Sequence, residues 1–518
     1  MPRAAEQGNE RSSVGAGMER NKMMTQKRFN ALLSMLLCAA MLLSMVAMLS
    51  GCTRSGKNDS PALQHKILHY YSEKDSTSYF FVDGKKLEDR IGSGISTFLS
   101  VDGTSAAVIA ATALYRVDAN GIILVYPAAV TRAVLSMDGK SILFATATKA
   151  FLYSSDTGET TEFEGIEAET VLSLALSEDA KTAAVTVGQK GGRTATYICS
   201  EGKAEKNSED TYAVAISNGA ERMYRLEYVD GELTGRLHFV QNGKDSVIST
   251  NASHYFEVNR DATEITFDVK SKTHYSAKGS EAKQLVDASA LSLAGAQYST
   301  MGGSECTVLL KNAGSLFNSM FYTEYNAKDS DGNQFVEYDL YFVNSSKKAT
   351  KLVGGATQFT VQPDGTSVYC VVDSSLYTVS AFNPKKPELV ESNVYAFGAD
   401  EGFKNVYLTD IYGNVRLKKD GAAKLSDIIL MNISHSAMMN NGTLLCIGLY
   451  DDGTLCSIKG TESKILDENV YYFEVYGDVA AYYKKAGSKD GLYDVYMSED
   501  GENFTLCVEQ AAIGGKAS

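Results

Sequence analysis

The segments FLSVDG (98–103), VLSMDG (134–139), LALSEDA (174–180) and VAISNGA (214–220) decide how this chain folds. In each of them a small polar residue follows an apolar pair and leads into an Asp-Gly-like turn. Related segments are FEVNRDA (256–262), FTVQPDG (359–365) and MMNNG (438–442). The first five aspartate-equivalent positions are 102, 138, 179, 219 and 261, so the steps between them are 36, 41, 40 and 42 residues. A turn that recurs at a nearly constant spacing indicates a repeated structural unit.

A second marker follows each turn, 13 to 19 residues after the aspartate-equivalent position. It is a residue pair that is most often Leu-Tyr: Leu114-Tyr115, Leu152-Tyr153, Thr196-Tyr197, Leu237-His238, His274-Tyr275, Leu376-Tyr377 and Leu455-Cys456. The intervening runs are short, rich in Val, Ile, Leu, Tyr and Phe, and bounded by turn residues, which predicts strands. Four short strands in about 40 residues cannot bury their own faces, so neighbouring units must stack.

This pattern favours an all-β fold, a β-propeller of about eight four-stranded blades in one ring. Two stacked smaller propellers are the alternative. The units resemble the TolB-like and WD-like β-propeller repeats of bacterial envelope proteins, in which a Pro-Asp-Gly turn precedes one strand and a Leu-Tyr pair marks another. Only Gln362-Pro363-Asp364-Gly365 shows the full turn, and no unit ends in Trp-Asp, because the chain has no Trp. We expect the first strands, near 66–81, to close the ring against residues 493–509.

The repeat domain is expected over residues 66–518, with an insertion near 291–356 where NAKDSDGNQFVE (326–337) interrupts the pattern. Tyrosines cluster around an acidic loop here, and aromatic rings with a polar edge suit ligand binding. We predict a ligand rim formed by Tyr322, Tyr325, Asp329 and Asp331. The alternative is that these side chains pack between blades. The loop is not an EF-hand, because Gly332 is its fourth residue and Leu340 its twelfth.

The first 51 residues have the pattern of an export signal. Lys22, Lys27 and Arg28 precede the uncharged run ALLSMLLCAAMLLSMVAMLS (31–50), as in a secretory signal peptide. Twenty residues of helix are about 30 Å long, so an uncleaved membrane anchor is the alternative. In both cases the positive flank stays inside and the body lies outside the cytoplasm.

The residues Leu49-Ser50-Gly51-Cys52 resemble the bacterial lipoprotein box. This resemblance implies cleavage before Cys52, lipidation of its thiol and attachment of the protein to the membrane surface. Residues 52–65 are then the lipidated cysteine and a polar tether, which would reach roughly 20 Å as a flexible coil. The true start of translation is left open among Met1, Met18, Met23 and Met24.

The charge of the chain excludes some partners. The net charge is −14, and residues 1–51 contain six basic and three acidic residues, so the remaining body carries −14 − 3 = −17. Such a body repels phosphate backbones, and we therefore expect no nucleic-acid partner. We expect the lipid membrane, through Cys52, and an envelope protein or glycan as the partners.

Motifs for catalysis or metal binding are missing from the sequence. The six body cysteines, at 199, 306, 370, 446, 456 and 507, form no CxxC and are expected to be buried free thiols, although 446 and 456 are close enough to close a hairpin. The sequence has no GxSxG and no phosphate-binding loop. His238 and His274 replace the marker tyrosine, so we expect them to pack. We therefore predict no metal, cofactor or catalytic residue and a binding or assembly platform. The alternative is a glycan-processing enzyme with paired carboxylates at the central mouth of the propeller.

Overall fold

The computed structural model describes residues 67–512, apart from gaps at 287–305, 312–319 and 419–432 and shorter gaps in turns. The export signal, Cys52 and the tether lie outside the described residues. Residues 60–518 form one compact unit, and its described part consists of strands and one short 3-10 helix, η1 (Asn218–Ala220). No helix among the described residues is both long and apolar enough to cross a membrane.

Six sheets each contain four consecutive antiparallel strands. Their strands are β5 (Ser96–Leu99), β6 (Ser105–Ala110), β7 (Ala113–Asp118), β8 (Gly121–Tyr126); β9 (Arg132–Leu135), β10 (Ser141–Ala145), β11 (Ala150–Ser154), β12 (Glu159–Glu162); β13 (Thr170–Leu176), β14 (Thr182–Gly188), β15 (Thr194–Ser200), β16 (Lys203–Glu209); β17 (Tyr212–Ile216), β18 (Arg222–Tyr228), β19 (Thr234–Gln241), β20 (Lys244–Ser253); β21 (Phe256–Val258), β22 (Glu264–Val269), β23 (Lys272–Ala277), β24 (Lys283–Val286); and β35 (Ile433–Met438), β36 (Leu444–Gly448), β37 (Leu455–Lys459), β38 (Glu462–Asp467).

Three further sheets depart from this plan. One has three strands, β32 (Ala396–Ala399), β33 (Val406–Thr409) and β34 (Val415–Lys418). One has seven strands, β25 (Cys306–Lys311), β26 (Met320–Ser330), β27 (Asn333–Val343), β28 (Ala349–Val361), β29 (Ser367–Val372), β30 (Ser375–Ser380) and β31 (Glu388–Ser392). The long strand β28 pairs first with β27 and then with β29, so it ends one four-stranded unit and begins the next.

The last sheet joins the two ends of the described chain. It combines β1 (Ile67–Ser72), β2 (Thr77–Val82), β3 (Lys85–Lys86) and β4 (Ile91–Gly92) with β39 (Val470–Tyr476), β40 (Val479–Lys485), β41 (Leu492–Ser498) and β42 (Thr505–Ala512). Ser72 is the register partner of Ala511, and the Ser72 hydroxyl donates to the Glu509 carbonyl at 2.8 Å. The expected closure of the first strands against residues 493–509 is therefore confirmed.

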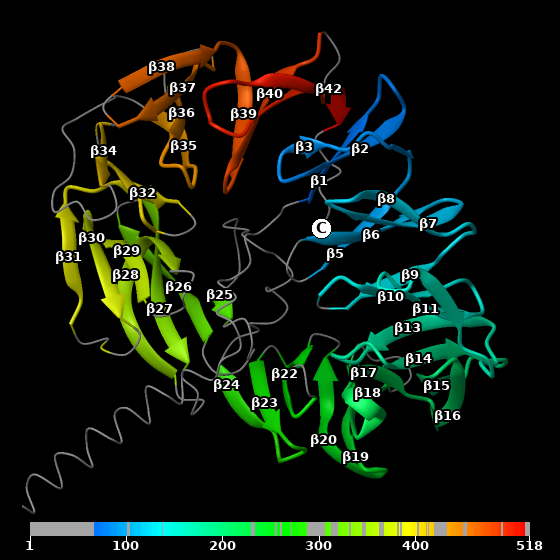
Figure 1. The fold of residues 1–518 in the computed structure, drawn as a ribbon. Coiled ribbons are helices and arrows are strands. Elements are labelled where there is room, and N and C mark those ends of the chain that lie inside the picture. The colour runs from blue at the N-terminus through cyan, green and yellow to red at the C-terminus, as the bar shows by residue number, and fades with distance from the viewer. Residues whose placement is uncertain are drawn as a thin grey trace, which may run out of the picture. The chain divides into compact units, whose positions relative to one another are not determined.

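Consecutive sheets lie side by side (Figure 1), and apolar side chains are buried between several of them. Phe144 and Phe151 of one sheet pack with Leu114 of the preceding one, and Phe80 of β2 packs with Val108 of β6. The all-β propeller of four-stranded antiparallel sheets is confirmed, and the described residues form nine sheets where about eight blades were expected.

The repeated turn is held by the same set of hydrogen bonds in different sheets, between the first and second strands of a unit. The Ser136 hydroxyl accepts from the Ser141 amide at 2.9 Å and donates to Asp138 at 2.6 Å, and Asp138 accepts from the Lys140 amide. Ser177, Asp179 and Thr182 form the same bonds in the next sheet. Burial opposes ionisation of Asp138, but these hydrogen bonds outweigh it and lower the pKa of the carboxyl.

The backbone conformation of the turn explains why glycine follows aspartate at this position. The residue three positions after the turn serine is left-handed, with φ of 64° at Gly139, 55° at Ala180 and 56° at Ala220. Glycine adopts this conformation at no steric cost, whereas other residues are strained in it. All seven Leu-Tyr-like pairs lie on third strands, where Leu114, Leu237, Leu376 and Leu455 are fully buried. The two sequence markers are thus one turn and one core strand of each unit.

Candidate functional site

The first strands of the sheets lie beside one another. Strand β5 contacts β9, β9 contacts β13, β13 contacts β17, β32 contacts β35, and β35 contacts β39. Such neighbouring first strands are the inner strands of propeller blades. We call the end of the sheets where these strands begin, and where second and third strands connect, the first-strand face. The repeated Ser-Asp turns lie at the opposite end, the marker-turn face.

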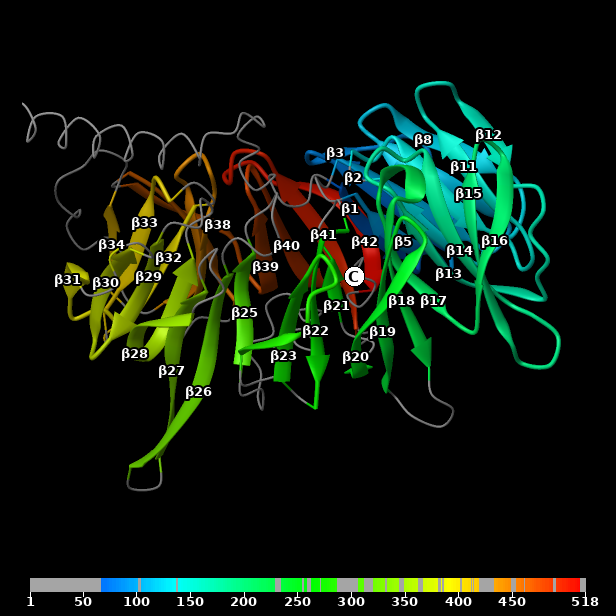
Figure 2. The ribbon, with the colours of Figure 1, turned by 90° about the horizontal axis from the view of Figure 1, so that it is seen from below.

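The sequence-predicted rim belongs to a hairpin that points toward the first-strand face. Strands β26 and β27 pair from Met320↔Val343 to Ser330↔Asn333, whereas the described residues of β25 pair with β26 only as far as Glu324. Residues 326–337 therefore extend the hairpin beyond its neighbours, and Figure 2 shows this projection. Tyr322, Tyr325 and Asp329 lie on β26, but their side chains are outside the described part of the chain, as is all of Asp331.

Exposed tyrosines mark the same face on two other sheets. Tyr395 precedes β32 and is 69% exposed, and Tyr412, between β33 and β34, is 68% exposed. Tyr471 and Tyr472 open the inner strand β39 and are 57% and 39% exposed. Large apolar side chains at a surface signal a binding site when they gather rather than occur singly. Tyr471 and Tyr472 meet this condition, because other aromatic rings lie next to each of them.

Tyr471 is held in place by its own sheet. The pairing of β39 with β40 shifts between Val470 and Tyr472, so Tyr471 is an extra residue in a β-bulge. A bulge redirects a side chain and ends regular pairing at a strand edge. One side of the Tyr471 ring packs on the buried Tyr493, at 4.8 Å between centroids, and the Lys485 ammonium lies 5.9 Å from the ring centre. The ring is thus fixed from behind and exposed in front.

Tyr472 lies between two aromatic side chains. Its ring stacks on His435 of β35 at 5.0 Å and on Tyr483 of β40 at 6.3 Å. The His435 ring also packs on Phe473, whose carbonyl lies 3.3 Å from Nε2. Burial lowers the pKa of His435, and the carbonyl contact only partly offsets this. A neutral imidazole at physiological pH therefore completes this group, which we call the aromatic platform: His435, Tyr471, Tyr472, Lys485 and Tyr493.

A set of buried tyrosine hydroxyls braces the platform from within the closing sheet. Tyr483 donates to Glu474 at 2.8 Å, Tyr476 donates to the same oxygen, and Tyr70 of β1 lies 3.1 Å from the Tyr483 hydroxyl. Burial raises the pKa of Tyr70 to about 12 and also raises those of Tyr476 and Tyr483. All three phenols keep their protons at neutral pH, so they remain hydrogen-bond donors.

Carboxylates are sparse on the inner strands. Among the first strands that the structure describes, only β21 and β39 contain acidic residues, Glu257 and Glu474. The Glu257 side chain is not described, and Glu474 is engaged by tyrosine hydroxyls. No acid pair for glycoside hydrolysis is therefore seen among the described inner strands. No cluster of three or more His, Cys, Asp or Glu suited to a metal occurs within the described range either.

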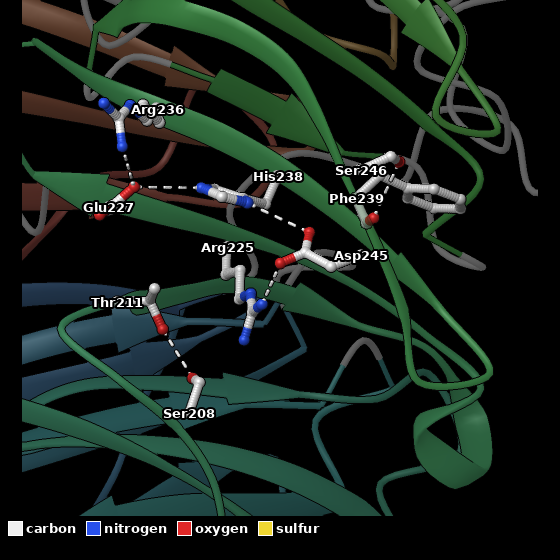
Figure 3. Close-up of polar contacts among 9 residues, drawn as sticks. All are labelled: Ser208, Thr211, Arg225, Glu227, Arg236, His238, Phe239, Asp245 and Ser246. Atoms are coloured by element: carbon white, nitrogen blue, oxygen red, sulfur yellow. Dashed lines mark hydrogen bonds and ion pairs between the residues drawn. The ribbon is translucent and has the colours of Figure 1, made fainter.

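The densest ionic network lies elsewhere, on β18, β19 and β20 (Figure 3). His238 lies between two carboxylates, with Nδ1 3.1 Å from Asp245 and Nε2 3.4 Å from Glu227. Arg225 pairs with Asp245, and Arg236 with Glu227. Each charge thus has an opposite charge beside it, and the network joins three strands of one sheet. His238 thus contacts two carboxylates with a side chain that is 12% exposed, and His274 stacks on Phe267 at 6.1 Å.

The described cysteines are free thiols. Cys199, Cys370 and Cys446 are buried as expected, whereas Cys456 and Cys507 are half-buried. Cys446 and Cys456 face each other in register on β36 and β37. Burial raises the pKa of the Cys446 thiol to about 12, so it is a poor nucleophile.

No protein-family model matches this sequence, and no curated protein matches it. Solved structures of similar fold include dipeptidyl peptidase 4 of Porphyromonas gingivalis, with 10% identity, a TM-score of 0.39, and coverage of 66% of this chain and 63% of the peptidase. A putative TolB of Agrobacterium tumefaciens has 12% identity and a TM-score of 0.29, over 45% and 84% of the two chains. The β-propeller domain of the Trilobed protease of Pyrococcus furiosus has 14% identity and a TM-score of 0.31, over 57% and 97%.

Sequence reasoning missed the aromatic platform. Its members come from three separate stretches, around residues 435, 471 and 485–493, and none of them belongs to the repeat markers. The available signal was the pair Tyr471-Tyr472 at the start of a predicted strand. Adjacent residues of a regular strand point to opposite faces, so only the bulge explains why both are exposed.

Proposed function

We propose that this protein is exported, lipidated at Cys52 and held at the outer surface of a membrane, where its propeller binds an envelope component. The signal-like segment and the lipobox resemblance support the location. The aromatic platform supports the binding role, because exposed rings fixed by buried packing are a common basis of recognition. The single observation that carries the proposal is the exposure of Tyr471 and Tyr472 on the inner strand of the closing sheet.

The hairpin tip at 326–337 is a second reason to propose that the first-strand face is the binding face. Topology directs this hairpin and the aromatic platform to the first-strand face, while the marker-turn face consists of tight, internally hydrogen-bonded turns. We therefore propose that ligands approach the first-strand face and that the predicted rim at Tyr322, Tyr325, Asp329 and Asp331 belongs to the same binding surface.

The attachment is tested by Cys52→Ala in the full chain, with Cys38→Ala in the signal segment as the matched control. Acyl-chain labelling and membrane fractionation should show loss of lipid and accumulation of a precursor or a released body for Cys52→Ala only. Unchanged labelling of Cys52→Ala would contradict lipidation at this site.

The binding role is tested by crosslinking the lipidated protein in intact membranes, with a photoreactive residue at Tyr471 or, as control, at the exposed Asp156 in the β11–β12 turn on the marker-turn face. Crosslinks to a defined envelope component from position 471 but not from 156 would support the proposal. Equal yields from both positions would contradict it.

A further inference from the structure

We infer that the aromatic platform binds an uncharged oligosaccharide, with a pyranose ring stacked on the open side of Tyr471. This inference rests on the proposed function and names its ligand class. Three features of the described residues lead to it: the exposed Tyr471 ring with its buried support, the charge of the body and the bulge in β39.

The first feature is an exposed aromatic ring with a firm support. Tyr493 is only 8% exposed and backs one side of Tyr471, while more than half of Tyr471 remains accessible. The C–H groups on one side of a pyranose ring form a flat, slightly positive surface. Such a surface complements the negative face of an aromatic ring. Because Tyr471 is already fixed, little side-chain entropy is lost when the sugar stacks on it.

The second feature is charge. The body carries a net charge of −17 once residues 1–51 are excluded. A polyanionic ligand, such as a phosphate-rich polymer, is repelled by the summed field of the body. Lys485 supplies one local positive charge beside Tyr471, enough to donate hydrogen bonds to sugar hydroxyl or acetamide oxygens but not to offset the field of the body. A neutral glycan therefore fits better than an acidic one.

The third feature concerns the strand edge. β39 is the terminal strand of its sheet, and an unpaired edge invites the addition of a peptide strand. The bulge at Tyr471 breaks the regular spacing of hydrogen-bonding groups at the start of this edge. A peptide in extended conformation therefore lacks a regular partner beside the platform. A sugar ring needs no such regular edge.

The inference is tested with the full lipidated protein in detergent, titrated with chitotetraose, an uncharged oligomer of N-acetylglucosamine. Calorimetry should show saturable binding. Tyr471→Ala should weaken it about tenfold, the effect expected from one lost aromatic contact. Tyr471→Phe keeps the ring and should retain most of the affinity. Leu389→Ala removes an equally exposed large side chain from the outer strand β31 and should leave the affinity unchanged.

Binding to insoluble cell-wall peptidoglycan, which contains both glycan and peptide, distinguishes failure of the glycan assignment from failure of the aromatic platform. If the wild-type protein ignores chitotetraose but its retention on peptidoglycan is abolished by Tyr471→Ala, the glycan assignment is wrong and the platform stands. If Tyr471→Ala and Leu389→Ala affect both probes equally, or Tyr471→Ala changes neither, the inference and the platform both fail. Thermal unfolding of each variant, with a midpoint matching the wild type, confirms that these differences report on binding.

Discussion

At the scale of single residues, a small set of polar side chains fixes the repeated turn. Ser136 and Ser177 each accept a hydrogen bond from the amide five positions later and donate one to the aspartate two positions later. These bonds hold the first turn of a unit while apolar side chains pack on either side. The pattern visible in the sequence is therefore the chemical requirement of one turn, repeated from sheet to sheet.

Replacement of the turn serine should be costly. In Ser177→Ala the buried Thr182 amide loses its side-chain acceptor and Asp179 loses a donor. We expect a loss of about 1–3 kcal/mol in the free energy of unfolding, the usual effect of an unsatisfied buried donor. Urea titration measures it, with Lys190→Ala in an exposed turn as the control. A change as small as that of the control would show that the turn is held by the backbone alone.

Asp500 gives the turn between β41 and β42 a pH dependence. Its carboxylate accepts hydrogen bonds from Ser498, from the Glu502 amide and from the amide and side chain of Asn503. Burial opposes ionisation, but these bonds outweigh it and hold the pKa well below its usual range. Because the folded-state pKa is lower than the unfolded-state value near 4, ionised Asp500 stabilises the fold above about pH 4. This contribution is lost as the pH falls through the lowered pKa.

We therefore expect Asp500→Ala to destabilise the protein at pH 7 and to differ less from the wild type as the pH approaches 2. Urea unfolding at a series of pH values measures this convergence. Asp156→Ala, in an exposed turn of another sheet, should give a small difference at every pH. A difference for Asp500→Ala that stays constant down to pH 2 would contradict the assignment.

At the scale of elements, the repeat could be predicted from sequence because its determinants are local. The turns and the Leu-Tyr pairs lie within one unit, and the structure places them on the first turn and the third strand. Sheet boundaries could not be predicted, because β28 belongs to two units and the terminal strands share a sheet. The aromatic platform could not be predicted either, since Tyr471 and Tyr493 meet only after β39, β40 and β41 have paired, and His435 comes from β35 of the neighbouring sheet.

The closure between β1 and β42 is a small contact that joins two distant parts of the chain. Ser72 and Ala511 are register partners, and both are fully buried. A disulfide between cysteines introduced by Ser72→Cys and Ala511→Cys should link the ends and raise stability, by about 2–4 kcal/mol from the restriction of the unfolded chain. Guanidinium unfolding of the oxidised and reduced forms measures the gain. An oxidised form that is no more stable than the reduced one would show that closure does not limit unfolding.

At the scale of the whole molecule, the two faces of the propeller differ in kind. The marker-turn face is made of tight turns whose polar groups bond to one another. The first-strand face carries the β26–β27 hairpin, Tyr395, Tyr412 and the aromatic platform. Because binding residues are usually placed on surfaces positioned by a rigid scaffold, this asymmetry supports our proposal that ligands approach the first-strand face.

Hydrogen–deuterium exchange of the lipidated protein, with and without cell-wall peptidoglycan, tests this assignment most directly. The account predicts added protection at residues 470–472 and 485–493 and in the hairpin tip at 326–337, with no change at the marker turns 136–141 and 177–182. Protection confined to the marker turns, or spread equally over both faces, would contradict it.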